Sequence, residues 1–251
     1  VTSGAIADAI SMKNLLKIAA LFLGILLAVL AVSAFPTVKT VRYRLSLFVD
    51  TPEGVRSGSG VVLVRSEFRG PGIGNAVENQ TTGEAVVVDL GSRGVLFALL
   101  SGDPLRYAHG EGSQPEPIYL LSHTFRSMVG NGGPEFQDAL NRAKPHVDLS
   151  FDSLPMLVRF RNTPDPKTVE RVDPDDLAAS FGSGVSMKRA TIEITDDPVT
   201  TGIDRYLGWW FAQAKKPFDP PAFRYPDNSP RGYNTVNVTE FIQPFDWRWS
   251  K

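Results

Sequence analysis

Residues 41–64 read VRYRLSLFVDTPEGVRSGSGVVLV, two apolar stretches joined by a turn sequence. In the first stretch every second residue from Val41 to Val49 is apolar, which is typical of a strand with one buried face. Thr51-Pro52-Glu53-Gly54 then places proline at the second position of a turn and glycine at the fourth, where these residues are favoured. The sequence therefore predicts a β-hairpin of strands over residues 41–49 and 55–64.

Other runs rich in valine, leucine or isoleucine predict further strands over residues 84–90, 95–100, 118–124, 156–161 and 185–195. The first two of these runs flank Gly91-Ser92-Arg93-Gly94, so they predict a second hairpin. Residues 70–83 separate the two hairpins, contain several glycines and few apolar residues, and predict a loop.

The sequence predicts few helices, all of them short. Asp173 is suited to cap a helix that begins at Pro174 and ends at Gly182. Residues 134–143 predict a second helix. Thr200 or Thr201 is placed to cap a third helix, which would reach about residue 214 and bury one face, made of Ile203, Leu207, Trp210 and Phe211.

Neighbouring strands without long intervening helices are typical of antiparallel sheets. Over residues 35–216 we therefore predict a mainly β or α+β domain, built of antiparallel hairpins with a few short helices. One N-terminal transmembrane or signal helix precedes this domain. An arm rich in proline and aromatic residues comes after it over residues 217–251.

The N-terminal helix is predicted from residues 15–32, which read LLKIAALFLGILLAVLAV with Lys17 as the one charged residue. A helix that is apolar on every face is typical of lipid rather than of the surface of a soluble domain. As a helix the run would cover about 27 Å, nearly the thickness of a bilayer core. We predict a flank over residues 1–14 and a membrane segment over residues 15–34 that includes Leu15, Ile18, Leu21, Phe22, Leu26 and Leu30.

Two fates of this segment are compatible with the sequence. Val32-Ser33-Ala34 supplies the small residues that a signal peptidase reads, so cleavage near Ala34 would release the domain into the periplasm. An uncleaved segment would instead anchor the chain in the inner membrane, with the domain on the periplasmic side. We expect the anchored form and keep the secreted form as the alternative.

The composition of the 251 residues excludes several classes of function. The formal net charge is -1, and basic and acidic residues are interspersed rather than grouped, which argues against nucleic acid as a partner. Since the chain has no cysteine, it forms no disulfide, no thiolate nucleophile and no cysteine-ligated zinc site. We expect no cofactor.

Acid–base or metal chemistry would depend first on the three histidines, which are His109, His123 and His146. None of them has a second ligand at metal-binding spacing. A periplasmic hydrolase that uses one histidine with aspartates is therefore an alternative function, and it requires the histidine to lie within reach of an aspartate and a serine.

Two other motifs have simple structural explanations. The aspartates that cluster are Asp173, Asp175, Asp176, Asp196 and Asp197. They lack the glycine and closing glutamate of an EF-hand, so helix capping explains the first three and a turn explains the last two. Ser57-Gly58-Ser59-Gly60 lacks the lysine of a P-loop and is explained as the polar start of a strand.

Arginine and tryptophan dominate the hot spots of binding surfaces, and all four tryptophans lie near the end of the chain. We predict a candidate interaction surface that includes Arg159, Arg161, Trp209, Trp210, Trp247, Arg248 and Trp249. The leading hypothesis is a non-enzymatic envelope protein, a binding or assembly module that contacts the membrane through its N-terminal helix and a protein partner through its domain. An accessory subunit of a larger membrane complex is a further alternative to the hydrolase.

Four stretches of the chain also carry a family resemblance. They read YRLSLFVDTPEGVRSGSGVVLVR (43–65), GEAVVVDLGSRGVLFALL (83–100), LPMLVRFRNTPDPKTVERVDPDDLAASFG (154–182) and KRATIEITDDPVTTGID (188–204). These stretches resemble an uncharacterised family of exported or membrane-anchored bacterial proteins, mostly from alphaproteobacteria. The resemblance covers most of the domain and implies no activity, ligand or catalytic residue.

Overall fold

The computed structural model of the chain describes residues 16–25, 36–68, 77–103, 117–130, 133–209, 222–224, 235–237 and 241–243. The chain divides into two compact units, one made of Val1–Val38 with Glu67–Glu78 and the other of Lys39–Ser66 with Asn79–Lys251.

In the first unit, residues 16–25 form a helix on which Ile18, Leu21 and Phe22 are exposed. The other three residues of the predicted membrane segment, Leu15, Leu26 and Leu30, lie outside the described residues. Within the described ranges, no helix combines the length and the apolar character needed to cross a membrane.

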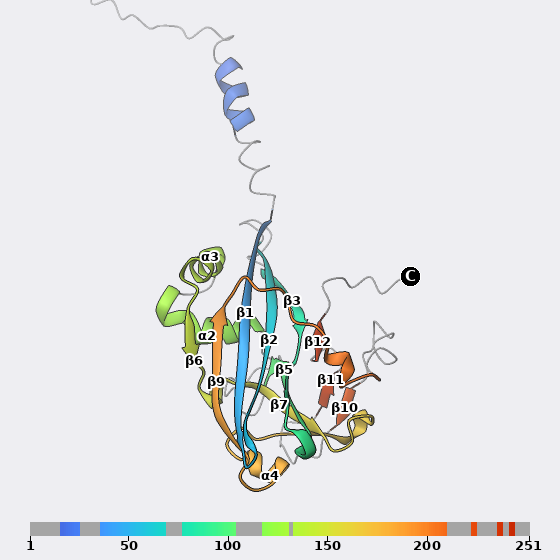
Figure 1. Ribbon diagram of the computed structural model, residues 1–251. Helices are drawn as coiled ribbons and strands as arrows, with labels where there is room; N and C mark the ends of the chain where they lie inside the picture. The colour runs from blue at the N-terminus through green and yellow to red at the C-terminus, as the bar shows by residue number, and fades with distance from the viewer. Residues whose placement is uncertain are drawn as a thin grey trace, which may run out of the picture. The chain divides into compact units, whose positions relative to one another are not determined.

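The largest sheet has six strands in the order β12-β3-β2-β1-β9-β6 (Figure 1). These strands are β1 (Thr37–Thr51), β2 (Gly54–Phe68), β3 (Val77–Glu84), β6 (His146–Asp148), β9 (Ser186–Ile194) and β12 (Ile242–Gln243). β1 and β2 are the predicted first hairpin, and β1 pairs antiparallel with β9, with Leu45 opposite Ile192. Alternate residues of β1 are buried from Val41 to Val49, as the period of two predicts.

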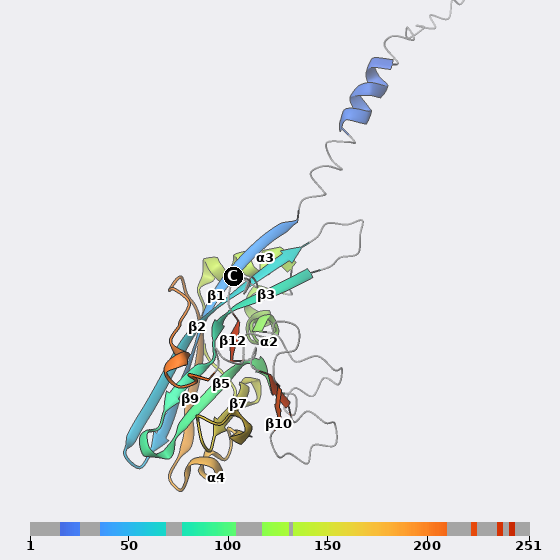
Figure 2. The same ribbon diagram turned by 90° about the vertical axis from the view of Figure 1, so that its right-hand side faces the viewer.

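A second, four-stranded sheet has the order β4-β5-β7-β8, with all its pairs antiparallel. Its strands are β4 (Val86–Asp89), β5 (Val95–Gly102), β7 (Pro155–Phe160) and β8 (Val169–Arg171). β4 and β5 are the predicted second hairpin. Ala85 alone separates β3 from β4, so the chain passes from one sheet to the other at a single residue. Figure 2 shows the two sheets from the side.

The four-stranded sheet is buried on both faces, because successive residues of β5 enter different core clusters. Leu96, Ala98 and Leu100 belong to a cluster that also contains the inward side chains of β1 and β9. Phe97 and Leu99 belong to a second cluster. Burial on both faces explains why the strand sequences of this sheet are continuously apolar rather than alternating.

The second cluster is rich in aromatic residues and draws on distant parts of the chain. The ring of Phe97 lies 5.7 Å from that of Phe160 and 5.9 Å from that of Phe241, both edge to face. Ile203 and Leu207 complete the cluster from a segment beyond the end of β9. Phe241 is fully buried, so the C-terminal stretch predicted as an arm supplies part of the core.

The helices of the second unit are short, and they bury apolar side chains such as Leu121, Leu140 and Phe181 in the first core cluster. They are α2 (Pro117–Val129), α3 (Gly133–Ala143) and α4 (Leu177–Phe181). Short 3-10 turns are η1 (Gly91–Arg93), η2 (Phe151–Ser153), η3 (Pro166–Thr168) and η4 (Ile203–Arg205), and β10 (Ala222–Arg224) pairs with β11 (Thr235–Asn237). The described residues therefore form mainly antiparallel β-sheets with a few short helices, as predicted.

Two predictions of secondary structure were wrong. Residues 118–124 were predicted as a strand but belong to α2, whose buried residues Pro117, Leu120, Leu121 and Phe125 have helical spacing. A short apolar run does not distinguish a strand from a buried helix, and proline at the first helical position favours the helix. Residues 77–83 were predicted as part of a loop but belong to β3, because pairing with β2 and β12 overrides their polar composition.

The predicted helices were correct in part. α3 confirms the helix over residues 134–143. α4 begins at Leu177 rather than at Pro174, and Gly182 is its C-cap, as expected. The cap of α4 is Asp176, which accepts a hydrogen bond from the backbone of Ala179, and not Asp173. Of the helix predicted from residue 200, the structure describes residues 200–209, and these contain only the turn η4. Ile203 and Leu207 are nevertheless buried together, as predicted.

Candidate functional site

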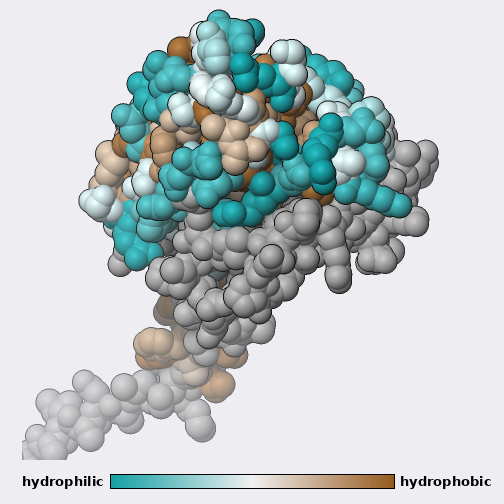
Figure 3. All heavy atoms as spheres, turned by 90° about the horizontal axis from the view of Figure 1, so that it is seen from below, coloured by the Kyte–Doolittle hydropathy of each residue, from teal (hydrophilic) through white to brown (hydrophobic). Residues whose placement is uncertain are grey.

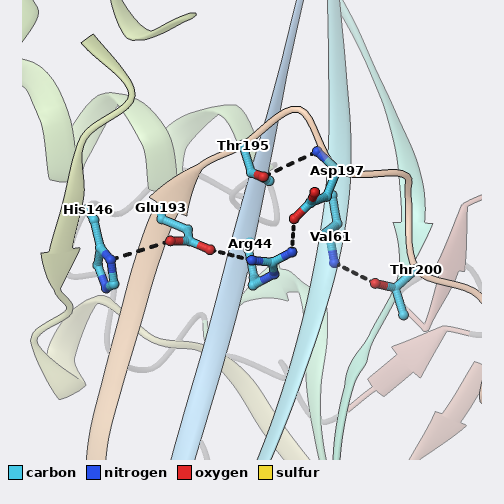
Figure 4. Close-up of polar contacts among 7 residues, drawn as sticks. All are labelled: Arg44, Val61, His146, Glu193, Thr195, Asp197 and Thr200. Atoms are coloured by element: carbon cyan, nitrogen blue, oxygen red, sulfur yellow. Dashed lines mark hydrogen bonds and ion pairs between the residues drawn. The ribbon is translucent and has the colours of Figure 1, made fainter.

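A row of charged side chains crosses the outer face of the six-stranded sheet from β6 to β1 (Figure 4). Glu193 on β9 lies directly opposite His146 on β6 and Arg44 on β1. Its carboxylate is 3.3 Å from Nδ1 of His146 and 2.5 Å from Nη1 of Arg44. Residues directly opposite each other on one face of a sheet are close enough to interact, so strand register alone aligns the row.

The segment that leaves β9, residues 195–202, continues the row across β1 to β2, and we call it the strap (Figure 4). Its Asp197 forms an ion pair with Arg44. The backbone N–H of Thr195 donates to the carbonyl of Arg42 at 3.1 Å. Thr200 and Val61 bond to each other twice, through the Thr200 N–H at 3.1 Å and the Thr200 hydroxyl at 2.9 Å.

Two further ion pairs lie near the row, one beside β6 and the other further along β9 and β1. Lys144, just before β6, pairs with Asp196 of the strap. Lys188 on β9 pairs with Asp50 on β1 at 3.0 Å. In both pairs each charge lies beside one of opposite sign, and the side chains are 43–75% exposed, so each pair contributes little to stability.

The electrostatics of the row favour its charged state. Partial burial opposes the charge on Arg44, but the hydrogen bonds to Asp197 and Glu193 outweigh it, and the pKa of Arg44 is raised. The same hydrogen bond with Arg44 lowers the pKa of Asp197. Both partners therefore stay ionised at neutral pH.

The row contains one element of acid–base chemistry, the pair of His146 and Glu193. A carboxylate on Nδ1 orients a histidine in hydrolases, but such a site also needs a nucleophile on the other ring nitrogen. The His146 side chain is 58% exposed, on the edge strand of the sheet, and its carboxylate partner is Glu193. His123 is exposed on α2, and His109 lies outside the described residues. Both described histidines therefore lie exposed at the surface, and His146 has a carboxylate partner.

The predicted interaction surface is only partly accessible. Arg159 donates to Glu170 at 2.9 Å and to the carbonyl of Ser180, and its guanidinium stacks on the ring of Phe181. Arg161 also pairs with Glu170, at 2.7 Å, and remains 63% exposed.

Trp209, from the same predicted surface, is anchored rather than free. Its indole N–H donates to the carbonyl of Thr163 at 2.8 Å, and its ring packs against Phe160. The other predicted residues of this surface, Trp210, Trp247, Arg248 and Trp249, lie outside the described residues.

The remaining motifs have structural roles. Asp173 accepts from the backbone of Asp175 and forms the turn before α4, while Asp196 and Asp197 lie in the strap. No group of three metal ligands occurs among the residues that the structure describes. Ser57-Gly58-Ser59-Gly60 lies within β2, as predicted, and the glycines allow β4 to approach closely.

Arg44, Glu193 and Lys144 were not predicted as site residues, although the alternation of β1 indicates which of its side chains face outward. Arg42 and Arg44 occupy the polar positions of an alternating strand, which predicts that they face away from the core. The partners of these arginines depend on strand register between residues about 150 positions apart, and register between distant strands is not encoded in the local pattern. Seen from the end with the β1–β2 turn and α4, the described surface is mostly hydrophilic with small apolar areas (Figure 3).

No protein-family model, curated protein or solved structure matches this chain.

Proposed function

We propose that the chain is a non-enzymatic envelope protein, a binding or assembly module held at the inner membrane by its N-terminal segment. The second compact unit, Lys39–Ser66 with Asn79–Lys251, which we call the folded unit, would lie on the periplasmic side. The observation that carries the proposal is the uninterrupted apolar character of residues 18–32. On the described helix of residues 16–25, Leu21 and Phe22 are exposed by 64% and 67%. Side chains of this size are stabilised by transfer into lipid, by about 1.5–3 kcal/mol each.

The folded unit supports a binding role rather than a catalytic one. One face of its six-stranded sheet carries charged side chains that pair across neighbouring strands, as for Arg44 with Glu193 and Lys188 with Asp50. Such a face favours recognition of another surface over enclosure of a small substrate, since small-molecule sites are concave and mainly apolar.

The direct test is the intact mass of the protein from membrane and soluble fractions of a Gram-negative host. We expect the protein in the membrane fraction, with a mass that includes residues 15–34. A soluble protein whose mass matches a chain that begins at Phe35 would favour the secreted form over the anchored form. Protease added to spheroplasts should digest the folded unit, and protection until the inner membrane is lysed would contradict the proposed side.

A pair of variants separates anchoring from folding. Leu21→Arg places a charge in the apolar segment, which costs about 2.5–3.5 kcal/mol at the centre of a membrane helix, and should shift the protein towards the soluble fraction. Val55→Arg is the matched control, because Val55 is exposed by 52% on β2 and its charge would stay in water. Equal partitioning of the two variants would contradict the anchor.

The partner role needs its own experiment. Crosslinking in intact cells followed by purification from solubilised membranes should recover the chain with a second protein. Recovery of uncrosslinked monomer in several detergents would count against a binding or assembly role. Constant stoichiometry with several other membrane proteins would instead favour an accessory subunit of a larger complex.

A further inference from the structure

The strap differs from the strands around it in the contacts that hold it. All of residues 195–202 are described, and none of them belongs to either core cluster. The strap is held by its backbone and hydroxyl bonds to Arg42 and Val61 and by two ion pairs. The carboxylates of these ion pairs are exposed, Asp196 by 75% and Asp197 by 51%. An exposed ion pair is a weak attachment that salt screens, and its loss changes an opening equilibrium by up to about fivefold.

Residues 203–209 continue the chain from the end of the strap and cover the second core cluster. Ile203 and Leu207 are buried in that cluster, together with Phe97 and Met156. Residues 203–209 belong to no strand, so no β-ladder joins them to either sheet. The backbone N–H of Ile203 donates to the Glu84 carboxylate at 2.8 Å, so a polar contact also attaches residues 203–209 to the end of β3.

The sheets beneath are held differently. β1 lies between β2 and β9 and bonds to both, and its residues Leu45 and Leu47 are buried in the first cluster. Segments with few buried contacts open at lower free energy than core strands, in cooperative units that coincide with structural elements. The strap, residues 195–202, has few such buried contacts. Residues 203–207 bury Ile203 and Leu207 but are joined to the sheets by no β-ladder, so both stretches are held less firmly than β1.

We infer that residues 195–207 open as a unit without unfolding of the sheets, that the polar contacts of the strap act as the latch, and that this opening uncovers the aromatic second cluster. This opening involves only the second compact unit, so it does not depend on whether the chain is anchored in a membrane.

Hydrogen exchange of the full chain tests the independence of the unit. The amides of Thr200, Ile203 and Leu207 are all hydrogen-bonded, so each exchanges only when its bond opens. We expect them to exchange together, and at least about tenfold faster than the amides of Leu45 and Leu47 on β1. Equal rates in both groups would mean that the strap opens only with the whole fold, and would overturn the inference.

A charge-reversal pair tests the latch itself. Lys144 has a φ of 44°, a backbone conformation that aspartate tolerates, so Lys144→Asp removes the ion pair without straining the backbone. This variant should speed exchange of residues 200–207 by about two- to fivefold, with β1 unchanged. Lys144→Asp combined with Asp196→Lys should restore the original rate. Unchanged exchange in the single variant, or faster exchange throughout the fold, would contradict the latch.

Two native methionines report whether the second cluster is uncovered. Met156 lies in the second cluster and Met187 in the first, and they are exposed by 1% and 7%. Oxidation by peroxide requires access to the sulfur atom. In Lys144→Asp we expect oxidation of Met156 to accelerate by the same factor as strap exchange, while oxidation of Met187 keeps its rate. Faster strap exchange without faster oxidation of Met156 would show that opening leaves the cluster covered, and would overturn that part of the inference.

Discussion

Gly58 on β2 lies so close to Val87 on β4 that a Cβ atom at position 58 would stand 1.9 Å from the Val87 carbonyl oxygen. The contact is with backbone, which cannot move aside as a flexible side chain can. Gly58→Ala should therefore separate the two sheets locally and destabilise the fold by about 3 kcal/mol or more. Urea unfolding followed by circular dichroism measures this loss.

The control for this position is Ser57→Ala, one residue earlier on the same strand. Ser57 is exposed, so its substitution should change the free energy of unfolding by less than about 0.5 kcal/mol. Equal stability of Gly58→Ala and Ser57→Ala would mean that the sheets do not approach as closely at this point as the structure has them.

Phe241 gives the second prediction, because it joins the C-terminal stretch to the core. Its side chain is fully buried, and its backbone carbonyl accepts a hydrogen bond from Ala85 at 2.7 Å, between β3 and β4. Phe241→Ala should cost about 3–5 kcal/mol and lower the melting temperature by roughly 10 °C. A shift of less than about 2 °C would place Phe241 outside the core.

The same residue shows where sequence patterns succeed and fail for this fold. β1 was predictable because its alternation and the turn at Pro52 are local signals that agree with each other. Phe241 stands in a stretch without periodicity, and its burial depends on a contact with residues near position 85, far away in the chain. α2 was assigned to the wrong class because its apolar run, Ile118 to Leu121, is too short to show a period.

The candidate site was harder to predict than the fold for a related reason. The outward direction of Arg44 can be inferred from the pattern of β1, but its pairing with Glu193 and Asp197 depends on register and on the path of the strap. The requirement that a catalytic histidine lie near an aspartate and a serine illustrates the same point. His146 has the carboxylate that a hydrolase would need, and only the structure shows that it stands on an open strand edge.

Glu53 and Arg93 join the β1–β2 turn to η1 and provide a prediction about pH. The hydrogen bonds from Arg93, at 2.9 and 3.1 Å, lower the pKa of Glu53 from 4.5 to about 2. A carboxyl whose pKa is lowered by folding contributes stability above its unfolded pKa and loses it as the pH falls through the folded value. The contribution of Glu53 should therefore disappear between about pH 4.5 and pH 2.

Arg93→Met tests this assignment. Without the guanidinium, the pKa of Glu53 should return towards 4.5, and NMR titration of the side-chain carboxyl measures it directly. Arg56→Met is a suitable control, since Arg56 is an exposed arginine on β2 that is not the hydrogen-bond donor to Glu53. A pKa near 2 in Arg93→Met would assign the shift to another cause.

Glu84 provides the opposite case, because burial raises its pKa above the usual 4.5 although the N–H of Ile203 partly offsets this effect. A carboxyl whose pKa is raised by folding stabilises the fold below its unfolded pKa, and this stability is lost as the pH rises through the folded value. At neutral pH the ionised Glu84 is therefore less favourable than a neutral side chain of the same shape. Glu84→Gln keeps an acceptor for Ile203 without the charge, so it should equal or exceed the original stability at pH 7 and remove this part of the pH dependence.

Glu84→Ala separates the hydrogen bond from the charge. It removes both, leaves the N–H of Ile203 without its acceptor, and should cost about 1–3 kcal/mol across the pH range. Chemical unfolding of the three proteins at pH 4 and pH 7 measures all these differences. If Glu84→Gln were as unstable as Glu84→Ala at pH 7, the negative charge itself would hold the turn at Ile203, and burial would not be what governs this carboxyl. The order expected from the geometry places Glu84→Gln highest at pH 7, because there the hydrogen bond remains and the cost of burying a charge is gone.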